Sequence, residues 1–353
     1  MTLKISMHTV CVTLNKMKLS AVYIAYTGGT IGMNQTARGF APTPGYLGNA
    51  LNAQPEFQDP SLPKLDLFEY PNLIDSSNVT PEHWNVMAED IAKHYNDYDG
   101  FVILHGTDTM AYSASALSFM LENLAKPVIF TGSQIPFSKL RSDARDNLIG
   151  AIQLAASSDI PEVSLYFHNT LYRGNCCSKT DSSGFAAFQS PNFPALATVG
   201  VDIKIDRDLL LKKPSHTLQV HRMNKVDIGT IHMFPGISAG VLKNYLRQPV
   251  RGLILMTYGA GNIPSHDEEL VSLIEEACER GVVIVNCSQC LKGSVDMQAY
   301  EAGSILARAG VVNAKDMMIE ACVTKLSWLF SHHQDPKIVR DLMSKNLRGE
   351  LRN

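Results

Sequence analysis

Short apolar runs alternate with longer, helix-patterned segments along most of this 353-residue chain. Such alternation is typical of βαβ units, in which parallel strands form a sheet and the intervening helices cover it. In the first 200 residues we expect strands at 21–26, 101–104, 127–131 and 163–167, and helices at 81–95, 110–124 and 142–156. The helix at 81 carries a start signal, since Thr80 can cap it and Pro81 suits its first position.

A polar stretch at 204–225 interrupts the pattern and predicts a linker. The alternation then resumes, with strands expected at 228–233, 252–256 and 282–286 and helices at 239–247, 267–280, 300–309, 315–331 and 336–345. We therefore predict two α/β domains: a larger N-terminal domain at 21–203 with a mainly parallel sheet, and a smaller, doubly wound C-terminal domain at 226–353. Residues 1–20 lack the features of a secretory signal, and we expect a disordered extension there, with Met17 as an alternative start.

Composition argues against several classes of partner. The net charge of −3 gives no electrostatic footprint for nucleic acid or an anionic membrane surface. No apolar run reaches the roughly 20 residues that span a bilayer. Seven cysteines, an odd number without a signal peptide, indicate reduced thiols in a cytoplasmic protein. The single C-x-x-C pair, Cys287 and Cys290, is weak evidence for zinc, and we expect neither a metal nor an organic cofactor.

Two threonine-bearing loops each follow an expected strand: Thr27-Gly28-Gly29-Thr30-Ile31 and His105-Gly106-Thr107-Asp108-Thr109. Ligands of open α/β sheets lie outside the carboxyl ends of the strands, so both loops can face one small pocket. A threonine hydroxyl becomes a nucleophile when a neighbouring group takes its proton. Read singly, the first loop also fits a tight turn, and the second fits a helix start capped by Asp108 or Thr109. His105 should point away from such a pocket.

Taken together, the two loops resemble the signature motifs of bacterial-type L-asparaginases, specifically the cytosolic type I branch. Further matches are Ile74-Asp75-Ser76-Ser77, Leu171-Tyr172-Arg173-Gly174-Asn175 with Lys179, and Tyr258-Gly259-Ala260-Gly261-Asn262. The resemblance extends from residue 21 to about residue 350. The paired motifs in this order are far more specific than either motif alone.

The resemblance implies an amidohydrolase that converts L-asparagine and water to L-aspartate and ammonia through a threonine acyl-enzyme intermediate. It implies that Thr30 is the nucleophile and that Thr107, Asp108 and Lys179 form a second catalytic group. It also implies that the amino-acid substrate is bound by Asp75, Ser76, Ser77, Thr107 and Asp108. Asp108 would pair with the substrate ammonium, since a zwitterion needs an anion there. A homodimer or homotetramer is implied as well, with Asn262 contributed by a partner chain.

The sequence departs from the family pattern at two positions. Phe40 stands where the family has a catalytic tyrosine, so the ring is kept and the hydroxyl is lost. We expect weaker activity, or a base role that rests wholly on Thr107 and Lys179. Ser288 and Cys290 align with part of an effector site found in some cytosolic members, but Met256 replaces the arginine of those relatives. Without its guanidinium an effector carboxylate loses a bidentate partner, so we expect no activation by asparagine.

Two alternatives belong to other functional classes. A non-catalytic amino-acid sensor would keep the same pocket without turnover, and Phe40 makes this worth testing. A serine hydrolase could instead use Ser238, because Gly236-Ile237-Ser238-Ala239-Gly240 matches the G-x-S-x-G nucleophile elbow. Too few strands follow Ser238 to build a hydrolase sheet around it. We expect it to cap the helix at 239–247.

Overall fold

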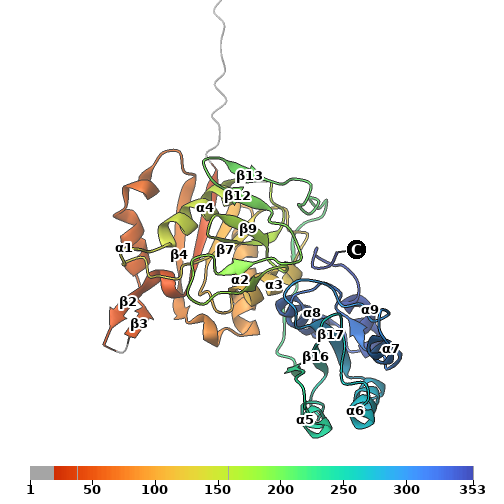
Figure 1. Cartoon of the computed structure of the whole chain (residues 1–353). Coiled ribbons are helices and arrows are strands. Elements are labelled where there is room, and N and C mark those ends of the chain that lie inside the picture. The colour runs from red at the N-terminus through yellow and green to blue at the C-terminus, as the bar shows by residue number, and fades with distance from the viewer. Residues whose placement is uncertain (1–19, 38, 158, 353) are drawn as a thin grey trace, which may run out of the picture.

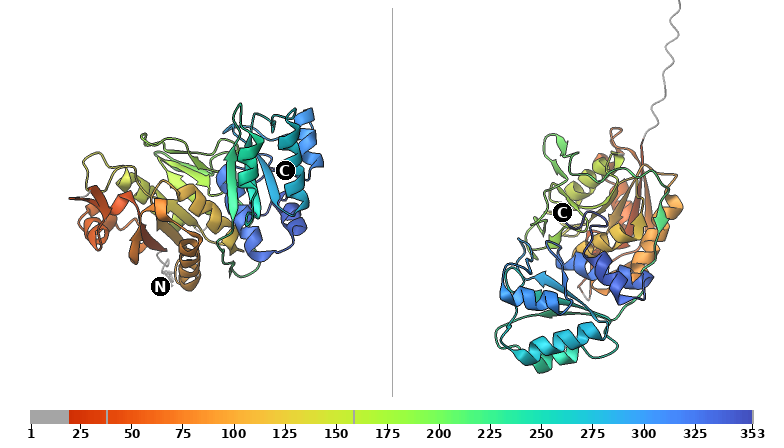
Figure 2. Two further views of the ribbon diagram at one scale, coloured as in Figure 1. Left: turned by 90° about the horizontal axis from the view of Figure 1, so that it is seen from below. Right: turned by 90° about the vertical axis from the view of Figure 1, so that its right-hand side faces the viewer.

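The computed structural model describes residues 20–37, 39–157 and 159–352, and they form two α/β domains joined side by side (Figure 1). The expected extension at residues 1–20 lies almost wholly outside this part of the chain. The larger body carries the red-to-green part of the chain and the smaller body the teal-to-blue part (Figure 2). Among the described residues, no helix is long and apolar enough to cross a membrane.

An eight-stranded sheet forms the centre of the N-terminal domain, in the order β13-β12-β9-β8-β7-β5-β1-β4. Five neighbouring strands are parallel: β8 (Val163–Phe167), β7 (Val128–Thr131), β5 (Gly100–Leu104), β1 (Ala21–Gly28) and β4 (Lys64–Ile74). The other three join in antiparallel fashion: β9 (Thr170–Arg173), β12 (Ala197–Val199) and β13 (Ile203–Ile205). The sheet is therefore mainly parallel, as the alternating pattern predicts.

Helices cover both faces of this sheet. Helices α2 (Pro81–His94) and α3 (Met110–Met120) pack on one face, while α1 (Tyr46–Asn52) and α4 (Ala144–Ala156) pack on the other. Side chains of β1 alternate between the two cores, with Tyr23 and Ala25 facing α2 and α3, and Ile24 and Tyr26 facing α4. A strand buried on both faces must be apolar throughout, which explains the uninterrupted run at 21–26.

A four-stranded parallel sheet forms the C-terminal domain: β15 (Ile228–His232), β16 (Gly252–Thr257), β17 (Val283–Ser288) and β18 (Val312–Asn313). One face is covered by α5 (Ala239–Tyr245), α6 (Glu268–Glu279) and α7 (Glu301–Arg308), and the other by α8 (Ile319–His332) and α9 (Pro336–Met343). The predicted smaller domain with a parallel sheet is confirmed. Its strands follow one another in sequence order and the three connecting helices lie on one face, so the sheet winds in one direction and is not doubly wound as predicted. Helix α8 also packs against α3 of the larger domain, where the hydroxyls of Thr324 and Ser115 lie 2.7 Å apart.

Several predicted boundaries are wrong, and each has a local cause. Strand β4 was not predicted, because its side chains are largely half-exposed and polar residues interrupt its apolar pattern. The helix expected at 110–124 ends at Met120, since the next two residues form β6 (Leu121–Glu122), which pairs with β14 (Gln219–Val220) inside the expected linker. The helix expected at 315–331 begins only at Ile319, after Lys315 adopts a positive φ of 53°. The start signal at Pro81 is confirmed: the ring Nδ1 of His83 accepts the backbone N–H of Thr80 at 3.1 Å.

Candidate active site

The two threonine loops lie where the order of strands in the larger sheet changes from one side of β1 to the other. Strand β1 lies between β4 and β5. After β1 the chain continues to β4 on one side, whereas after β5 it passes through α3 to β7 on the other side. Connections that diverge in this way open a crevice at the carboxyl ends of the two strands, which is the usual ligand site of open α/β sheets. Both loops therefore share one edge of the sheet, as the sequence predicts.

Glycines allow the loops to touch through their backbones. Gly29 has a φ of 87°, and a Cβ at this residue would lie 2.4 Å from the amide nitrogen of Gly106. A Cβ on Gly106 would in turn lie 2.5 Å from Oγ of Ser76, in the loop after β4. The Gly29 N–H also donates to the carbonyl of Ile74 at 3.2 Å. Three loops thus meet with no room for a methyl group between them.

Two of the four loop threonines hold the backbone in place. The Thr27 hydroxyl donates to the carbonyl of Leu104 at 2.8 Å, and the Thr109 hydroxyl donates to the carbonyl of Ser76 at 2.7 Å. Thr30 instead begins the 3-10 turn η1 (Thr30–Gly32) and is half-buried. Within the described part of the chain no hydrogen bond engages its side chain. Thr30 is therefore the hydroxyl of the first loop that a ligand can reach.

Lys179 joins the second loop to a separate hairpin. It lies on β10 (Ser178–Lys179), which pairs with β11 (Phe188–Gln189). Its Nζ donates to Oγ1 of Thr107 at 2.8 Å and to Oδ1 of Asp108 at 2.7 Å. The Lys179 side chain is mostly buried, whereas the Asp108 carboxylate is 65% exposed and can meet a cation from solvent. The three residues that the resemblance grouped together are in direct contact.

The C-terminal domain holds Lys179 at its place. The preceding residue, Ser178, donates its hydroxyl to Oε1 of Glu320 at 2.5 Å. Glu320 lies in the first turn of α8, and burial raises the pKa of its carboxyl group. This bond joins residues 142 positions apart in the sequence. A residue of the second domain thus positions a side chain of the first.

Gln134 belongs to this cluster and was not predicted. Its Oε1 accepts the Thr107 hydroxyl at 3.2 Å, and its Nε2 donates to the carbonyl of Gly184 at 3.0 Å. Its backbone N–H is bound by the carboxylate of Asp143 at 3.0 and 3.1 Å. The sequence contains a pattern that could have indicated it. Gly132, Ser133 and Gln134 directly follow the strand at 127–131, just as glycine and polar residues follow the strands at 21–26 and 101–104.

The residues implied for substrate binding lie in the loop after β4. Asp75 caps the 3-10 turn η3 (Ser76–Asn78), and its Oδ1 accepts the backbone N–H of Ser77 at 3.1 Å. Asp75 and Ser77 are exposed, whereas Ser76 is buried against Gly106. The loop therefore borders both threonine loops and offers a carboxylate and a hydroxyl to solvent beside them.

His105 holds the second loop from its buried side, through a hydrogen bond to the backbone of Gly106. It is buried, and because the carbonyl of Gly106 can only accept, the ring Nδ1 donates to it at 2.7 Å. The other nitrogen, Nε2, accepts from the hydroxyl of Ser113 at 3.0 Å, and Ser113 accepts from the indole of Trp84 at 2.8 Å. Burial lowers the pKa of His105 to about 4. This neutral imidazole is directed into the core, which matches the prediction that it faces away from the pocket.

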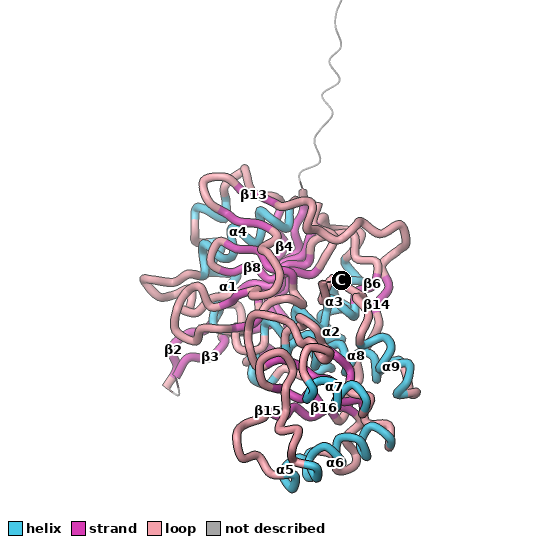
Figure 3. The backbone as a smooth tube through the Cα atoms, turned by 45° about the vertical axis from the view of Figure 1, so that its right-hand side comes forward, coloured by secondary structure: helices cyan, strands magenta, loops and turns pink. Residues whose placement is uncertain are grey.

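Phe40 lies apart from these contacts. It belongs to β3 (Gly39–Pro42), which forms a hairpin with β2 (Met33–Thr36) at one end of the larger domain (Figure 1 and Figure 3). Its ring is 43% exposed, and Nζ of Lys139 lies 5.1 Å from the ring centre. Phe40 is therefore partly in solvent and beside a cation.

The remaining candidates lie in the C-terminal domain. Ser288 donates to the carbonyl of Gly259 at 2.6 Å and accepts the N–H of Cys290 at 3.0 Å, and Asn262 lies in the turn that follows β16. Ser238 occupies the cap position of α5, but its side chain makes no capping hydrogen bond, so that detail of the prediction is wrong. In the described ranges, no group of three or more His, Cys, Asp or Glu side chains is arranged to hold a metal ion.

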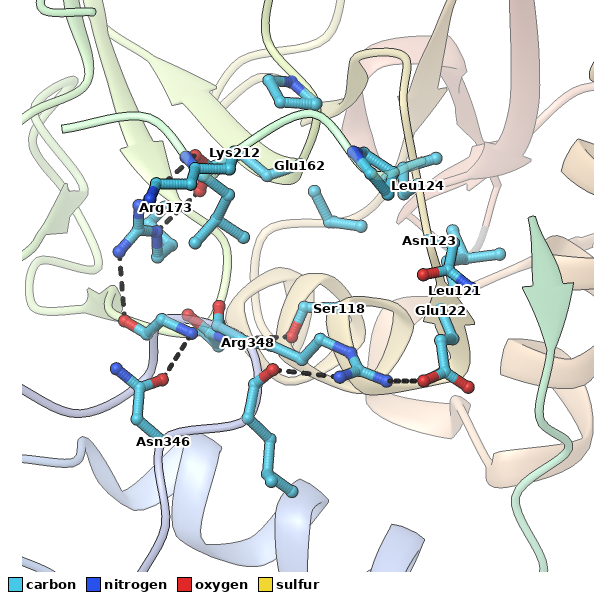
Figure 4. A pocket seen from close by; sticks show the side chains of 17 residues that line it. Ser118, Leu121, Glu122, Asn123, Leu124, Glu162, Arg173, Lys212, Asn346 and Arg348 are labelled. Atoms are coloured by element: carbon cyan, nitrogen blue, oxygen red, sulfur yellow. Dashed lines mark hydrogen bonds and ion pairs between the residues drawn. The ribbon is translucent and has the colours of Figure 1, made fainter. Parts of the chain in front are cut away.

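A cavity of about 320 Å³ lies at the junction of the two domains, away from the threonine loops. Figure 4 shows Arg348 of the C-terminal tail among the lining side chains, with Glu122 and Arg173 of the larger domain. Arg173 is ion-paired with Glu162 at 2.6 Å and donates to the carbonyl of Gly349 at 3.1 Å. The bond from Arg173 to Gly349 fastens the tail to the larger domain, and the cavity lies between the two.

Comparison with known proteins gives matches over both domains. A family model described as asparaginase, N-terminal matches residues 21–211, and one described as glutaminase/asparaginase C-terminal domain matches residues 225–343. The chain is 51% identical over 335 residues to L-asparaginase 1 of Escherichia coli K12, covering 95% of this chain and 99% of that protein. The crystal structure of L-asparaginase I from Vibrio cholerae matches with 47% identity and a TM-score of 0.88, covering 95% of this chain and 100% of the other. The thermostable L-asparaginase from Thermococcus kodakarensis matches with 32% identity and a TM-score of 0.86, covering 94% and 99%.

Proposed function

The chain belongs to the asparaginase family, and from that membership we propose that it is an L-asparaginase. It hydrolyses the side-chain amide of L-asparagine to give L-aspartate and ammonia. The observation that supports this most directly is the meeting of the two threonine loops, with Lys179 bound to both Thr107 and Asp108. The threonine mechanism, the residue roles and the oligomeric state are parts of the same proposal.

Substrate recognition follows from the charges around the crevice. L-asparagine is a zwitterion, so its ammonium requires an anion and its carboxylate requires donors. We assign the ammonium to Asp108, whose carboxylate is the more exposed partner of the Lys179 ion pair. The amino-acid end of the substrate is held by Asp75, Ser76 and Ser77, in the loop that borders both threonines.

The first chemical step is assigned to Thr30. Its Oγ1 attacks the side-chain amide carbon, and the resulting oxyanion is met by backbone N–H groups of the glycine-rich turn. The C–N bond then breaks, the proton lost by Thr30 ends on the departing nitrogen, and ammonia leaves a β-aspartyl ester. In the second step water attacks the ester carbon, the C–Oγ bond breaks, and Thr30 regains a proton. Thr107 assists the proton transfer in both steps, and Lys179, which donates to its Oγ1 at 2.8 Å, favours loss of the Thr107 proton.

Phe40 limits how Thr30 can be activated. A phenylalanine cannot take or give a proton, so this chain must activate Thr30 without the tyrosine hydroxyl of its family. Thr107 and Lys179, in contact with each other at the same edge of the sheet, are then assigned this role. A non-catalytic amino-acid sensor is the second candidate, and the absence of that hydroxyl is the observation that favours it.

We further propose a cytoplasmic homodimer or homotetramer, in which Asn262 of one chain completes the site of another. The family resemblance supports this arrangement. Activation by asparagine should be absent, since Met256 offers no cation where some relatives have an arginine. Light scattering tests the first proposal, and an active monomer would contradict it. A hyperbolic dependence of rate on asparagine concentration would support the second proposal, and a sigmoidal one would contradict it.

Ammonia release from L-asparagine tests the central proposal, with the wild type compared with Thr30→Ala and Ser238→Ala. An L-asparaginase that uses Thr30 loses its activity in Thr30→Ala and keeps it in Ser238→Ala. A sensor releases no ammonia in any of the three. A serine hydrolase shows the reverse pattern of the two substitutions. Running the same assay with glutamine and D-asparagine defines the range of substrates.

A further inference from the structure

We infer that Gln134 is a positioning residue that fixes the direction of the Thr107 hydroxyl, so that this hydroxyl presents only an acceptor to the substrate. The inference rests on the proposed function, in which Thr107 carries protons. It concerns a side chain that reaches the reacting groups only through Thr107.

The orientation of the Gln134 amide is fixed by its two neighbours. The carbonyl of Gly184 can only accept a hydrogen bond, so the group 3.0 Å from it must be the amide nitrogen. The amide oxygen is thereby turned toward Thr107, 3.2 Å away. A reversed amide would place two acceptors face to face at Gly184, which removes the usual ambiguity between amide oxygen and nitrogen.

The same reasoning fixes the proton of Thr107. The Lys179 ammonium has only donors and lies 2.8 Å from Thr107 Oγ1, so it occupies one lone pair of that oxygen. The Gln134 amide oxygen has only lone pairs, so it takes the hydroxyl proton. The oxygen Oγ1 has four tetrahedral positions: two covalent bonds and two lone pairs. The bond to Cβ, the O–H bond and the lone pair facing Lys179 take three of them. The last direction is a free lone pair, which can accept a hydrogen bond from water or from a hydroxyl.

Without Gln134 the Thr107 hydroxyl could rotate and act as a donor. It would then compete for the lone pairs that the nucleophile needs, and the attacking oxygen would lose its acceptor. A chain of bonds supports the correct arrangement, since Asp143 holds the Gln134 backbone and the Gly184 turn holds its amide nitrogen. An alternative, purely structural role for Gln134 would be to anchor that turn.

Three variants separate the two roles. Gln134→Met keeps the length and removes the acceptor, and we expect kcat to fall about tenfold with a smaller change in KM, as for the loss of one orienting hydrogen bond. Gln134→Glu keeps an acceptor facing Thr107 but loses the donor to Gly184. We expect Gln134→Glu to recover most of the wild-type kcat at alkaline pH. Its pH profile should move to higher pH, because a carboxylate near Lys179 favours the protonated amine.

Asp181→Ala is the matched control for the anchoring role. Its Oδ1 holds the same turn through the backbone N–H groups of Ser183 and Gly184, at 2.8 and 2.9 Å. We expect kcat of Asp181→Ala to stay within about twofold of wild type. The inference is overturned if Gln134→Glu is as impaired as Gln134→Met at every pH, or if Asp181→Ala reproduces the Gln134→Met defect. A wild type that releases no ammonia would overturn the proposed function and this inference together, whereas an active wild type with unaffected Gln134 variants would overturn the inference alone.

Discussion

Replacing Gly29 by alanine tests whether the backbone contact between the threonine loops builds the site. The Gly29 backbone has φ 87° and ψ 175°, a region essentially restricted to glycine, which costs an alanine about 1–3 kcal/mol. The added methyl would also lie 2.4 Å from the Gly106 nitrogen, where neither backbone can rotate aside, and overpacking of this kind costs about 1–3 kcal/mol. The lower conformational entropy of the unfolded alanine chain offsets about 0.4–1 kcal/mol of this. We therefore expect a net loss of about 1–6 kcal/mol.

Gly45→Ala provides the control within the same domain. Gly45 also has a positive φ, 70°, but a Cβ there would meet nothing within 4 Å, so only a left-handed strain of about 1–2 kcal/mol should appear, less the same entropy offset. Urea unfolding followed by circular dichroism measures the stability of both variants, and ammonia release measures their activity. Displacement of Thr30 from Thr107 by about 1 Å should reduce kcat/KM by about a hundredfold in Gly29→Ala. Equal destabilisation of the two variants, or full activity in Gly29→Ala, would refute the argument that this contact builds the site.

Three further outcomes follow from the buried groups and from Phe40. The pKa of His105 is about 4 in the folded chain and near 6.5 in the unfolded chain, so the unfolded chain binds the proton first as pH falls. About 3 kcal/mol of the free energy of unfolding that is present above pH 6.5 should therefore be lost as the pH falls to 4. The urea midpoint of His105→Gln should depend less steeply on pH than that of the wild type. Glu350→Gln should lower the free energy of unfolding by about 3–5 kcal/mol, because both side chains of the Lys325–Glu350 ion pair are fully buried and the change leaves the Lys325 ammonium without its anion. The double variant Lys325→Met, Glu350→Gln should melt at a higher temperature than Glu350→Gln alone. Phe40→Tyr should raise kcat for asparagine, and an unchanged or lower turnover would count against a missing hydroxyl as the limit on Thr30.

The elements that position the site could be predicted from sequence because they are encoded locally. Strands β1 and β5 are buried on both faces, so each is an unbroken apolar run that leads into a loop containing glycine and threonine. Strand β4 lies at the edge of the sheet and is buried only in part, so its alternating polar residues conceal it. Yet β4 carries the loop of Asp75 and Ser76, which the family resemblance supplied and local pattern did not.

Contacts between distant segments could not be predicted in the same way. Gln134 is an ordinary polar residue in the sequence, and its importance appears only when β7 lies beside β5 and brings it to Thr107. The position of Lys179 depends on a short two-residue strand and on a bond from Ser178 to Glu320, in the other domain. Neither the strand nor the bond leaves a periodic pattern in the chain.

The bond between Ser178 and Glu320 bears on how this protein can be divided. A fragment that stops before residue 225 contains both threonine loops, Asp75 and Lys179, which are the reactive groups proposed for this chain. It would lack α8, and with it the carboxylate that secures the lysine-bearing hairpin and the surface against which α3 packs. The two domains are thus not interchangeable modules. Fusing the N-terminal domain to a different second domain would require a helix that offers Ser178 an equivalent hydrogen-bond acceptor.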